Sequence, residues 1–157
     1  LNFLVASAFA NIGQFETFFD LFFDAYPYFK GSFLDFKTRG ILYLRLFQRS
    51  SQLKEHYLVL AKEALESALE QNQDDASLYR ILISLGKDAK KGADVVSYLK
   101  KLSESETTLA RGDIYFYVQE AVALGQKEIG KRIVERAKEQ YSYSRSITAA
   151  EELLRRE

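Results

Sequence analysis

The sequence contains no cysteine and no methionine, and its 157 residues include one histidine and one proline. Without cysteine the chain can form neither disulfides, nor thiolate nucleophiles, nor cysteine-rich zinc sites. That absence fits the cytoplasm, the periplasm and the exterior equally well, so the compartment stays open, with the cytoplasm as the default expectation. Because methionine is missing and the opening residues LNFLVASAFA already have a helical pattern, we expect a piece of a longer protein.

The chain also lacks a net charge and a long apolar run. Its 22 basic side chains are balanced by 22 acidic ones, so no overall charge attracts nucleic acid or an anionic membrane surface. No uninterrupted apolar run reaches about 18 residues, and Leu1 to Ala10 has neither a basic start nor a cleavage site. We therefore expect no nucleic-acid partner, no membrane insertion and no signal peptide.

Apolar residues recur at helical spacing along most of the chain. One set lies at Ile114, Tyr117, Val118 and Ala121, and a second follows at Gly130, Ile133, Val134 and Ala137. This pattern predicts two amphipathic helices. Gly125 lies between them and can take the positive φ that ends a helix, which predicts an antiparallel helical hairpin. Gly13 and Gly86 have the same surroundings, so we expect turns there too.

The spacing of these glycines predicts a repeat. Gly13 and Gly86 are 73 residues apart, whereas Gly86 and Gly125 are 39 apart, so a further break is expected near residue 50. Ser50 and Ser51 lie there and are good N-cap residues. Breaks at these places divide the chain into units of 37, 36 and 39 residues. Paired helices of this length bury their apolar faces by stacking, which produces a solenoid.

This order of helix, LG or IG break and second helix ending in a small residue such as Ala25 or Ala137 resembles the tetratricopeptide repeat. That family has a period of about 34 residues. Lys91 and Tyr98 depart from it, because the family has small residues at those positions. The resemblance implies one all-α domain over 1–157, a right-handed solenoid of about four hairpins. We expect hairpins at about 1–29, 32–72, 75–103 and 107–141, and a closing helix at about 146–157. Thr148 and Glu151 form a capping-box pattern for that closing helix.

The resemblance also implies a concave groove, lined by the first helix of each hairpin, that holds a peptide or protein partner. The groove residues would be Ser7, Asn11, Arg80, Ser84, Tyr115 and Gln119. They do not form the lysine and asparagine clamp with which some members of the family hold a terminal carboxylate. The expected function is a protein-interaction scaffold or adaptor. Three alternatives remain open: a peptide-sensing domain of a regulator, a secretion chaperone and an envelope-assembly lipoprotein.

The segment 15–29 carries more aromatic side chains than one helix face can bury. They are Phe15, Phe18, Phe19, Phe22, Phe23, Tyr26, Tyr28 and Phe29. Large exposed apolar patches on soluble proteins are commonly interfaces, so Phe19 and Phe23 are expected to contact a partner or a second copy of the chain. The alternative is that a helix over about 32–48 covers the excess. Both interpretations stay open at this point.

No residue pattern predicts catalysis or a cofactor. His56 has leucine at i+4, so it lacks a second metal ligand there, and no nucleophile is implied nearby. Asp74 and Asp75 precede a predicted helix and are expected to cap it. The stretch 86–92, GKDAKKG, lacks the spacing of a phosphate-binding loop. We therefore expect a protein that is not an enzyme and holds neither a cofactor nor a metal.

Basic residues between 127 and 138 alternate with acidic ones. Their spacing predicts ion pairs four positions apart, Glu128 with Arg132 and Lys131 with Glu135. Lys127, Arg136 and Lys138 belong to the same stretch. This pattern is typical of a solvated outer helix face rather than a nucleic-acid stripe.

Overall fold

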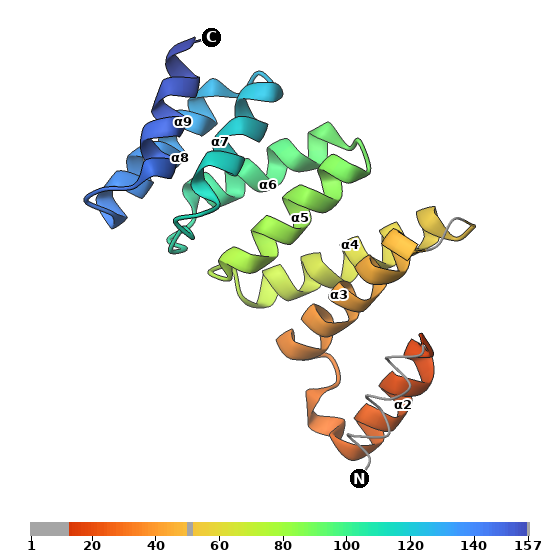
Figure 1. Cartoon of the computed structure of the whole chain (residues 1–157). Helices are drawn as coiled ribbons and strands as arrows, with labels where there is room; N and C mark the ends of the chain where they lie inside the picture. The colour runs from red at the N-terminus through yellow and green to blue at the C-terminus, as the bar shows by residue number, and fades with distance from the viewer. Residues whose placement is uncertain (1–12, 50–51, 157) are drawn as a thin grey trace. The chain divides into compact units, whose positions relative to one another are not determined.

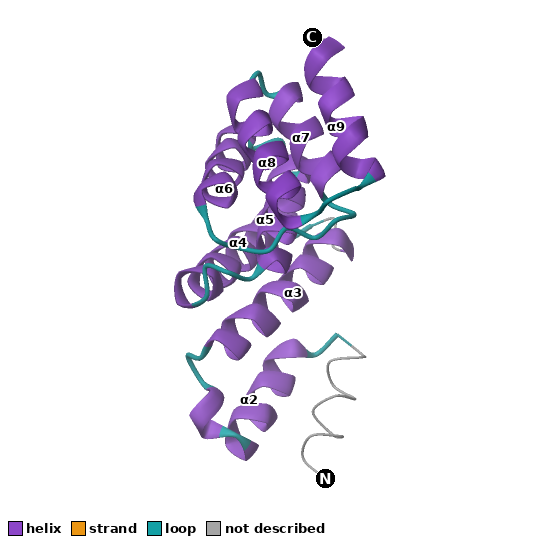
Figure 2. Cartoon of the chain, turned by 90° about the vertical axis from the view of Figure 1, so that its left-hand side faces the viewer, coloured by secondary structure: helices purple, strands orange, loops and turns teal. Residues whose placement is uncertain are grey.

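The computed structural model describes residues 13–49 and 52–156, and the side chains of residues 15, 16 and 156 are not part of that description. Throughout this part of the chain every regular element is a helix (Figures 1 and 2). The elements are α2 (Phe15–Ala25), a 3-10 turn η1 (Pro27–Phe29), α3 (Phe33–Arg49), α4 (Lys54–Gln71), α5 (Ala76–Asp88), α6 (Gly92–Glu104), α7 (Ile114–Ala123), α8 (Lys127–Gln140) and α9 (Arg145–Arg156). The expected all-α class is confirmed. None of these helices is long and apolar enough to cross a membrane.

The chain divides into two compact units, Leu1–Gln71 and Asn72–Glu157. In the first unit α3 and α4 pack against each other. Helix α3 ends at Arg49 and α4 begins at Lys54, on either side of the expected break near residue 50. Ser50 and Ser51 themselves lie outside the described residues. Gly40 of α3 is buried so close to α4 that an added Cβ would lie 2.5 Å from Leu65 Cγ. Buried alanines along α4, such as Ala61 and Ala68, leave room for this close approach.

Helix α3 begins with a reciprocal cap. The Ser32 Oγ accepts the Asp35 N–H at 3.3 Å, and the Asp35 Oδ2 accepts the Gly31 N–H at 2.7 Å. The first bond satisfies a backbone donor that a helix start leaves without a partner, and the second joins the Asp35 carboxylate to the residue before the cap. Upstream, α2 ends at Ala25 and Pro27 opens η1, because proline lacks the N–H that would continue a helix.

The second unit is built from two hairpins, α5 with α6 and α7 with α8, and from α9. Within it α6 packs on α7 and α8, and α9 packs on the same two helices (Figure 1). Asp75 caps α5 as expected, since its carboxylate accepts the N–H groups of Ser77 and Leu78. The predicted apolar set of α7 is fully buried: Ile114, Tyr117, Val118 and Ala121.

The turns of these two hairpins share one geometry but differ in residue type. In the second hairpin Gly125 has φ +71°, as predicted, and the Gln126 N–H donates to the Ala121 carbonyl at 2.7 Å. In the first hairpin the left-handed residue is Lys90, with φ +57°, and the Lys91 N–H donates to the Gly86 carbonyl at 2.8 Å. Both are the Schellman arrangement that ends a helix. The prediction of a turn at Gly86 was wrong.

Gly86 lies inside α5 and is buried. An added Cβ there would lie 2.8 Å from Val95 Cγ2 on α6, so this glycine permits close packing rather than a turn. The equivalent turn residues are Lys90 and Gly125, which are 35 positions apart rather than the 39 inferred from the two glycines. The sequence register was therefore displaced by four residues, about one helical turn.

The charged face expected on α8 is only partly solvated. Arg136 is half-buried, and its guanidinium donates to the carbonyls of Leu102 and, at 2.7 Å, Thr107. Burial lowers the pKa of Arg136 from its usual value. The Gln140 Oε1 accepts the Leu109 N–H at 2.8 Å, so α8 fastens the loop that precedes α7. The predicted pairing was wrong: the structure pairs Lys131 with Glu128 and Arg132 with Glu104.

Helix α9 begins at Arg145, so the expected capping box at Thr148 was also wrong. Thr148 is already helical, and its hydroxyl donates to the Ser144 carbonyl at 3.4 Å. Glu151 instead forms an ion pair with Lys138 of α8. This bond helps to hold α9 against the second hairpin.

Candidate partner-binding surfaces

The first helices of the two hairpins, α5 and α7, are joined by a polar and aromatic contact. Arg80 of α5 donates through Nε to the Asp113 Oδ1 at 3.1 Å and through Nη1 to the Ser84 Oγ at 2.7 Å. Its guanidinium carbon lies 3.5 Å from the centre of the Phe116 ring, a cation–π contact. Asp113 is the residue before α7, but its side chain does not cap that helix. The Asp113 side chain binds Arg80 of α5 instead of capping α7.

A second ion pair lies further along the same two helices. Lys87 Nζ and Glu120 Oε1 are 2.5 Å apart, and the ammonium lies 5.6 Å from the centre of the Phe116 ring. Glu120 is buried, whereas Lys87 is exposed. Two cations from α5 therefore lie near the Phe116 ring. We call the surface formed by Arg80, Ser84, Lys87, Asp113, Tyr115, Phe116, Gln119 and Glu120 the α5–α7 face.

The predicted groove residues fall on this face in part. Arg80 and Ser84 are hydrogen-bonded to each other, and Tyr115 and Gln119 lie one turn apart on α7. Tyr115 is 37% exposed, whereas the neighbouring Tyr117 is fully buried, and Gln119 is exposed as well. Ser7 and Asn11 lie outside the described residues.

Sequence reasoning missed four members of the face: Lys87, Asp113, Phe116 and Glu120. For Lys87 the sequence carried a usable signal, because Lys87 shares one face of α5 with Arg80 and Ser84 at i, i+4 and i+7. Lys87 was not recognised as part of this face, because a turn was expected at Gly86 and the helix was therefore expected to end before Lys87.

A buried hydroxyl lies beneath this surface. Tyr117 is fully buried, and among the described residues its hydroxyl finds no hydrogen-bond partner. Burial raises the pKa of Tyr117 far above its usual value, and the nearby Asp113 carboxylate adds to the increase. An orphaned buried hydroxyl of this kind is rare and destabilising.

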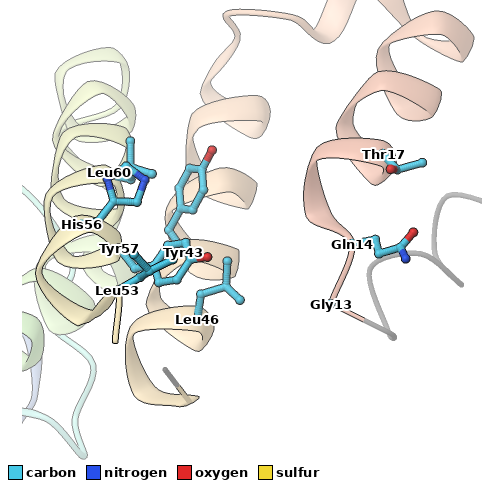
Figure 3. A pocket seen from close by; sticks show the side chains of 9 residues that line it. All are labelled: Gly13, Gln14, Thr17, Tyr43, Leu46, Leu53, His56, Tyr57 and Leu60. Carbon is cyan, nitrogen blue, oxygen red and sulfur yellow. The ribbon is translucent and has the colours of Figure 1, made fainter. Parts of the chain in front are cut away.

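The first unit has an open pocket of about 450 Å³. Figure 3 shows Tyr43 and Leu46 from α3, and Leu53, His56, Tyr57 and Leu60 at and along α4, facing the start of α2 at Gly13, Gln14 and Thr17. The only histidine of the sequence thus lies at a pocket rim and is exposed. Its ring lies beside that of Tyr57, with the two ring centres 5.6 Å apart. The lining is mixed, and it offers no acid, base and nucleophile set.

The aromatic segment of α2 is partly covered within the first unit. Phe18, Phe19 and Leu42 form a buried cluster, and Phe23 packs against it while staying half-buried. The Arg39 guanidinium carbon lies 4.5 Å from the centre of the Phe19 ring and 4.8 Å from that of Phe23. Arg39 is held by the buried Asp35 at 2.5 Å. Self-association through this segment stays a prediction.

Within residues 13–49 and 52–156, no cluster of three or more histidine, cysteine, aspartate or glutamate side chains could hold a metal ion. Comparisons with protein-family models, with curated proteins and with solved structures found no match. Any function is therefore argued from the geometry of these surfaces.

Proposed function

We propose that the chain is a protein-interaction module rather than an enzyme, and that it holds a peptide or protein partner on the α5–α7 face. The observation that carries the proposal is the partly exposed Tyr115 beside an ordered Arg80–Phe116 contact. Tyrosine and arginine are the residues most often found at interface hot spots. The partner is a protein rather than a nucleic acid, since the face carries acidic as well as basic groups.

We further propose that the fold is a right-handed solenoid of the tetratricopeptide type. The recurrence of the same turn at Lys90 and Gly125, 35 positions apart, supports this, because the family period is about 34 residues. The packing of α6 on both helices of the next hairpin is a second support. In such an array the first helices of successive hairpins line the binding surface.

The chemistry of the face favours a partner segment with alternating polar and apolar side chains. Tyr115 supplies an apolar ring with a polar hydroxyl, and Gln119 supplies a donor and an acceptor. The ion pair between Arg80 and Asp113 is partly exposed on both sides and contributes little to stability by itself. A partner can therefore exchange hydrogen bonds with Arg80 without a large loss of folding free energy, whereas the Lys87 pair holds the buried Glu120 and is expected to stay intact. This combination fits an adaptor or assembly subunit.

Affinity capture with matched variants tests this proposal. The full chain, its Tyr115→Ala variant and its Val59→Ala variant serve as baits, and the captured proteins are quantified by mass spectrometry. Val59 is an exposed apolar residue of α4 in the other unit and belongs to none of the surfaces described above, so its truncation is the control. We expect proteins captured by the wild type and by Val59→Ala to be depleted about fivefold or more with Tyr115→Ala.

Equal capture by all three baits would move the binding site away from the α5–α7 face. A circular dichroism spectrum that is unchanged by Tyr115→Ala is required, because loss of the fold would also abolish capture.

A further inference from the structure

The start of α9 and the loop before α7 line a second pocket, of about 390 Å³. It is lined by Arg111, Gly112, Tyr143, Ser144, Arg145 and Ser146. Two arginines and two serines thus line one space, and the lining residues include no aspartate or glutamate. None of these residues belongs to the α5–α7 face.

The two arginines have no acidic partner in the part of the chain that the structure describes. The Arg111 guanidinium carbon instead lies 4.6 Å from the centre of the Tyr141 ring. The Tyr141 hydroxyl in turn donates to the Leu109 carbonyl at 2.5 Å, which fixes the ring. The nearest acidic residue along the chain, Asp113, is already paired with Arg80. Arg111 is therefore positioned by packing while its charge stays unneutralised.

The helix start adds backbone donors to these charges. The Ser144 carbonyl accepts the N–H groups of Ile147 and Thr148, both at 3.1 Å. The N–H groups of Arg145 and Ser146, at the first two positions of α9, have no acceptor within the helix. The positive end of the helix dipole lies at the same place.

Ser144 provides the independent sign of a ligand. It is only 6% exposed and lies where a serine usually caps the helix, yet its hydroxyl takes part in no hydrogen bond among the described residues. The Ser144 carbonyl, and not its hydroxyl, accepts N–H groups at the start of α9. Because Ser144 lines the pocket, its hydroxyl is left available to donate a hydrogen bond to a group bound there.

We propose that this pocket binds a phosphate dianion, either free or carried as a phosphate monoester. The guanidinium groups of Arg111 and Arg145 match its two charges, since arginine forms paired hydrogen bonds to phosphate oxygens. The N–H groups of Arg145 and Ser146 and the hydroxyl of Ser144 supply further donors. The site is independent of the proposed protein-binding face, so either proposal can fail without the other.

A nuclear magnetic resonance titration of the full chain tests the site. Inorganic phosphate is added to the ¹⁵N-labelled protein at constant ionic strength, and N-acetyl-O-phosphoserine amide is titrated in parallel. Saturable shifts are expected at the backbone amides of Gly112, Arg145 and Ser146. The probe that binds more tightly identifies the source as free phosphate or as a phosphorylated side chain.

Three variants and one control sharpen the result. Arg111→Gln and Arg145→Gln should each weaken phosphate binding at least roughly tenfold, and Ser144→Ala roughly threefold. Arg155→Gln removes the same charge from an exposed position at the other end of α9, and it should leave the affinity unchanged. The spectra of the variants also show that each remains folded.

Shifts that fail to saturate with both probes would overturn the proposal. Equal weakening by Arg155→Gln and Arg145→Gln would also overturn it, because the effect would then come from overall charge. Saturable shifts confined to residues outside the pocket lead to the same conclusion.

Discussion

The hairpins α5/α6 and α7/α8 close with the same hydrogen bonds but place glycine in different roles. In the second hairpin Gly125 occupies the left-handed turn, and nothing lies within 4 Å of an added Cβ. In the first hairpin Lys90 occupies that turn, while Gly86 lies within α5 against Val95. One glycine provides backbone freedom and the other provides space between helices.

This difference teaches that a recurring glycine need not have a recurring function. Ala121 stands at the position of α7 that is equivalent to Gly86 in α5, because each carbonyl accepts the closing bond of its turn. Alanine is small enough for the second hairpin, whereas the first hairpin has a β-branched valine opposite. The size of the facing side chain decides which small residue is needed.

The largest effect is expected at a packing glycine in the other unit. Gly40→Val would place a side chain 2.5 Å from Leu65 Cγ and 3.2 Å from the Leu65 backbone nitrogen. Overpacking against a fully buried leucine and its backbone should lower the free energy of unfolding by about 3 kcal/mol. Urea denaturation followed by circular dichroism measures the change. Gly112→Val is the matched control, because that glycine has open space and an ordinary φ, and it should be near neutral.

A smaller loss is expected at the turn glycine. Gly125→Val puts a β-branched residue in the left-handed region and should lower the free energy of unfolding by about 2 kcal/mol. Gly125→Asn should lose less, because asparagine enters this region more readily. Equal losses for valine and asparagine in thermal melts would contradict a role in backbone conformation.

The buried tyrosine should respond in the opposite direction. Leu82 of α5 is equivalent to Tyr117 of α7, and both are buried, but only tyrosine brings a hydroxyl without a partner. Tyr117→Phe removes it and should raise the free energy of unfolding by about 1 kcal/mol at neutral pH. Denaturation of the two proteins at the same protein concentration measures the difference. A loss of stability would mean that the hydroxyl has a partner.

The same variant should change the pH dependence. Because the folded protein raises the pKa of Tyr117 above its unfolded value, the neutral form stabilises the fold fully below about pH 10. That contribution is lost as the pH rises further, because the unfolded chain then releases a proton that the folded chain retains. Tyr117→Phe should therefore weaken the alkaline decrease in stability. An identical decrease in both proteins would assign it to other groups, such as Tyr79, whose pKa burial also raises.

The smallest effect is expected at Lys90. Lys90→Gly relieves the left-handed strain of a residue with a Cβ but makes the unfolded chain more flexible. Relief of strain raises the free energy of unfolding, and the more flexible unfolded chain lowers it. We expect a net increase of about 0.5 kcal/mol. Thermal melts can detect it when Lys101→Gly, inside α6, is measured beside it. Lys101→Gly should lower the free energy of unfolding by about 1 kcal/mol, because glycine is disfavoured in a helix interior.

Local signals predicted much of this fold. The apolar spacing of α7 and the Asp75 cap depend on residues within about two helical turns of each other, so the sequence was sufficient to predict them. The turn at Lys90 could not be predicted in this way, because lysine carries no signal for positive φ. Aspartate is a common N-cap residue, and Asp113 directly precedes α7. Its side chain nevertheless binds Arg80 on another helix, a contact that sequence spacing does not predict.

The candidate sites show the same limit. Arg80 and Tyr115 were predicted from the repeat pattern, whereas Phe116 and Glu120 became visible only when the two helices were seen together. The pocket at Ser144 joins a loop at Arg111 to a helix start more than thirty residues later. Such a pair is brought together only by the packing of the second unit.

The measurement that tests the role of Gly86 most directly is the free energy of unfolding of Gly86→Ala in two backgrounds. In the wild type the new methyl group meets Val95 Cγ2 at 2.8 Å, so the substitution should destabilise the protein. In a Val95→Ala background that atom is absent, and the higher helix propensity of alanine should make the same substitution stabilising by about 1 kcal/mol. A change of sign between the backgrounds is the predicted result. The same loss in both backgrounds would show that Gly86 acts through its backbone, as a turn glycine does, and would contradict this account.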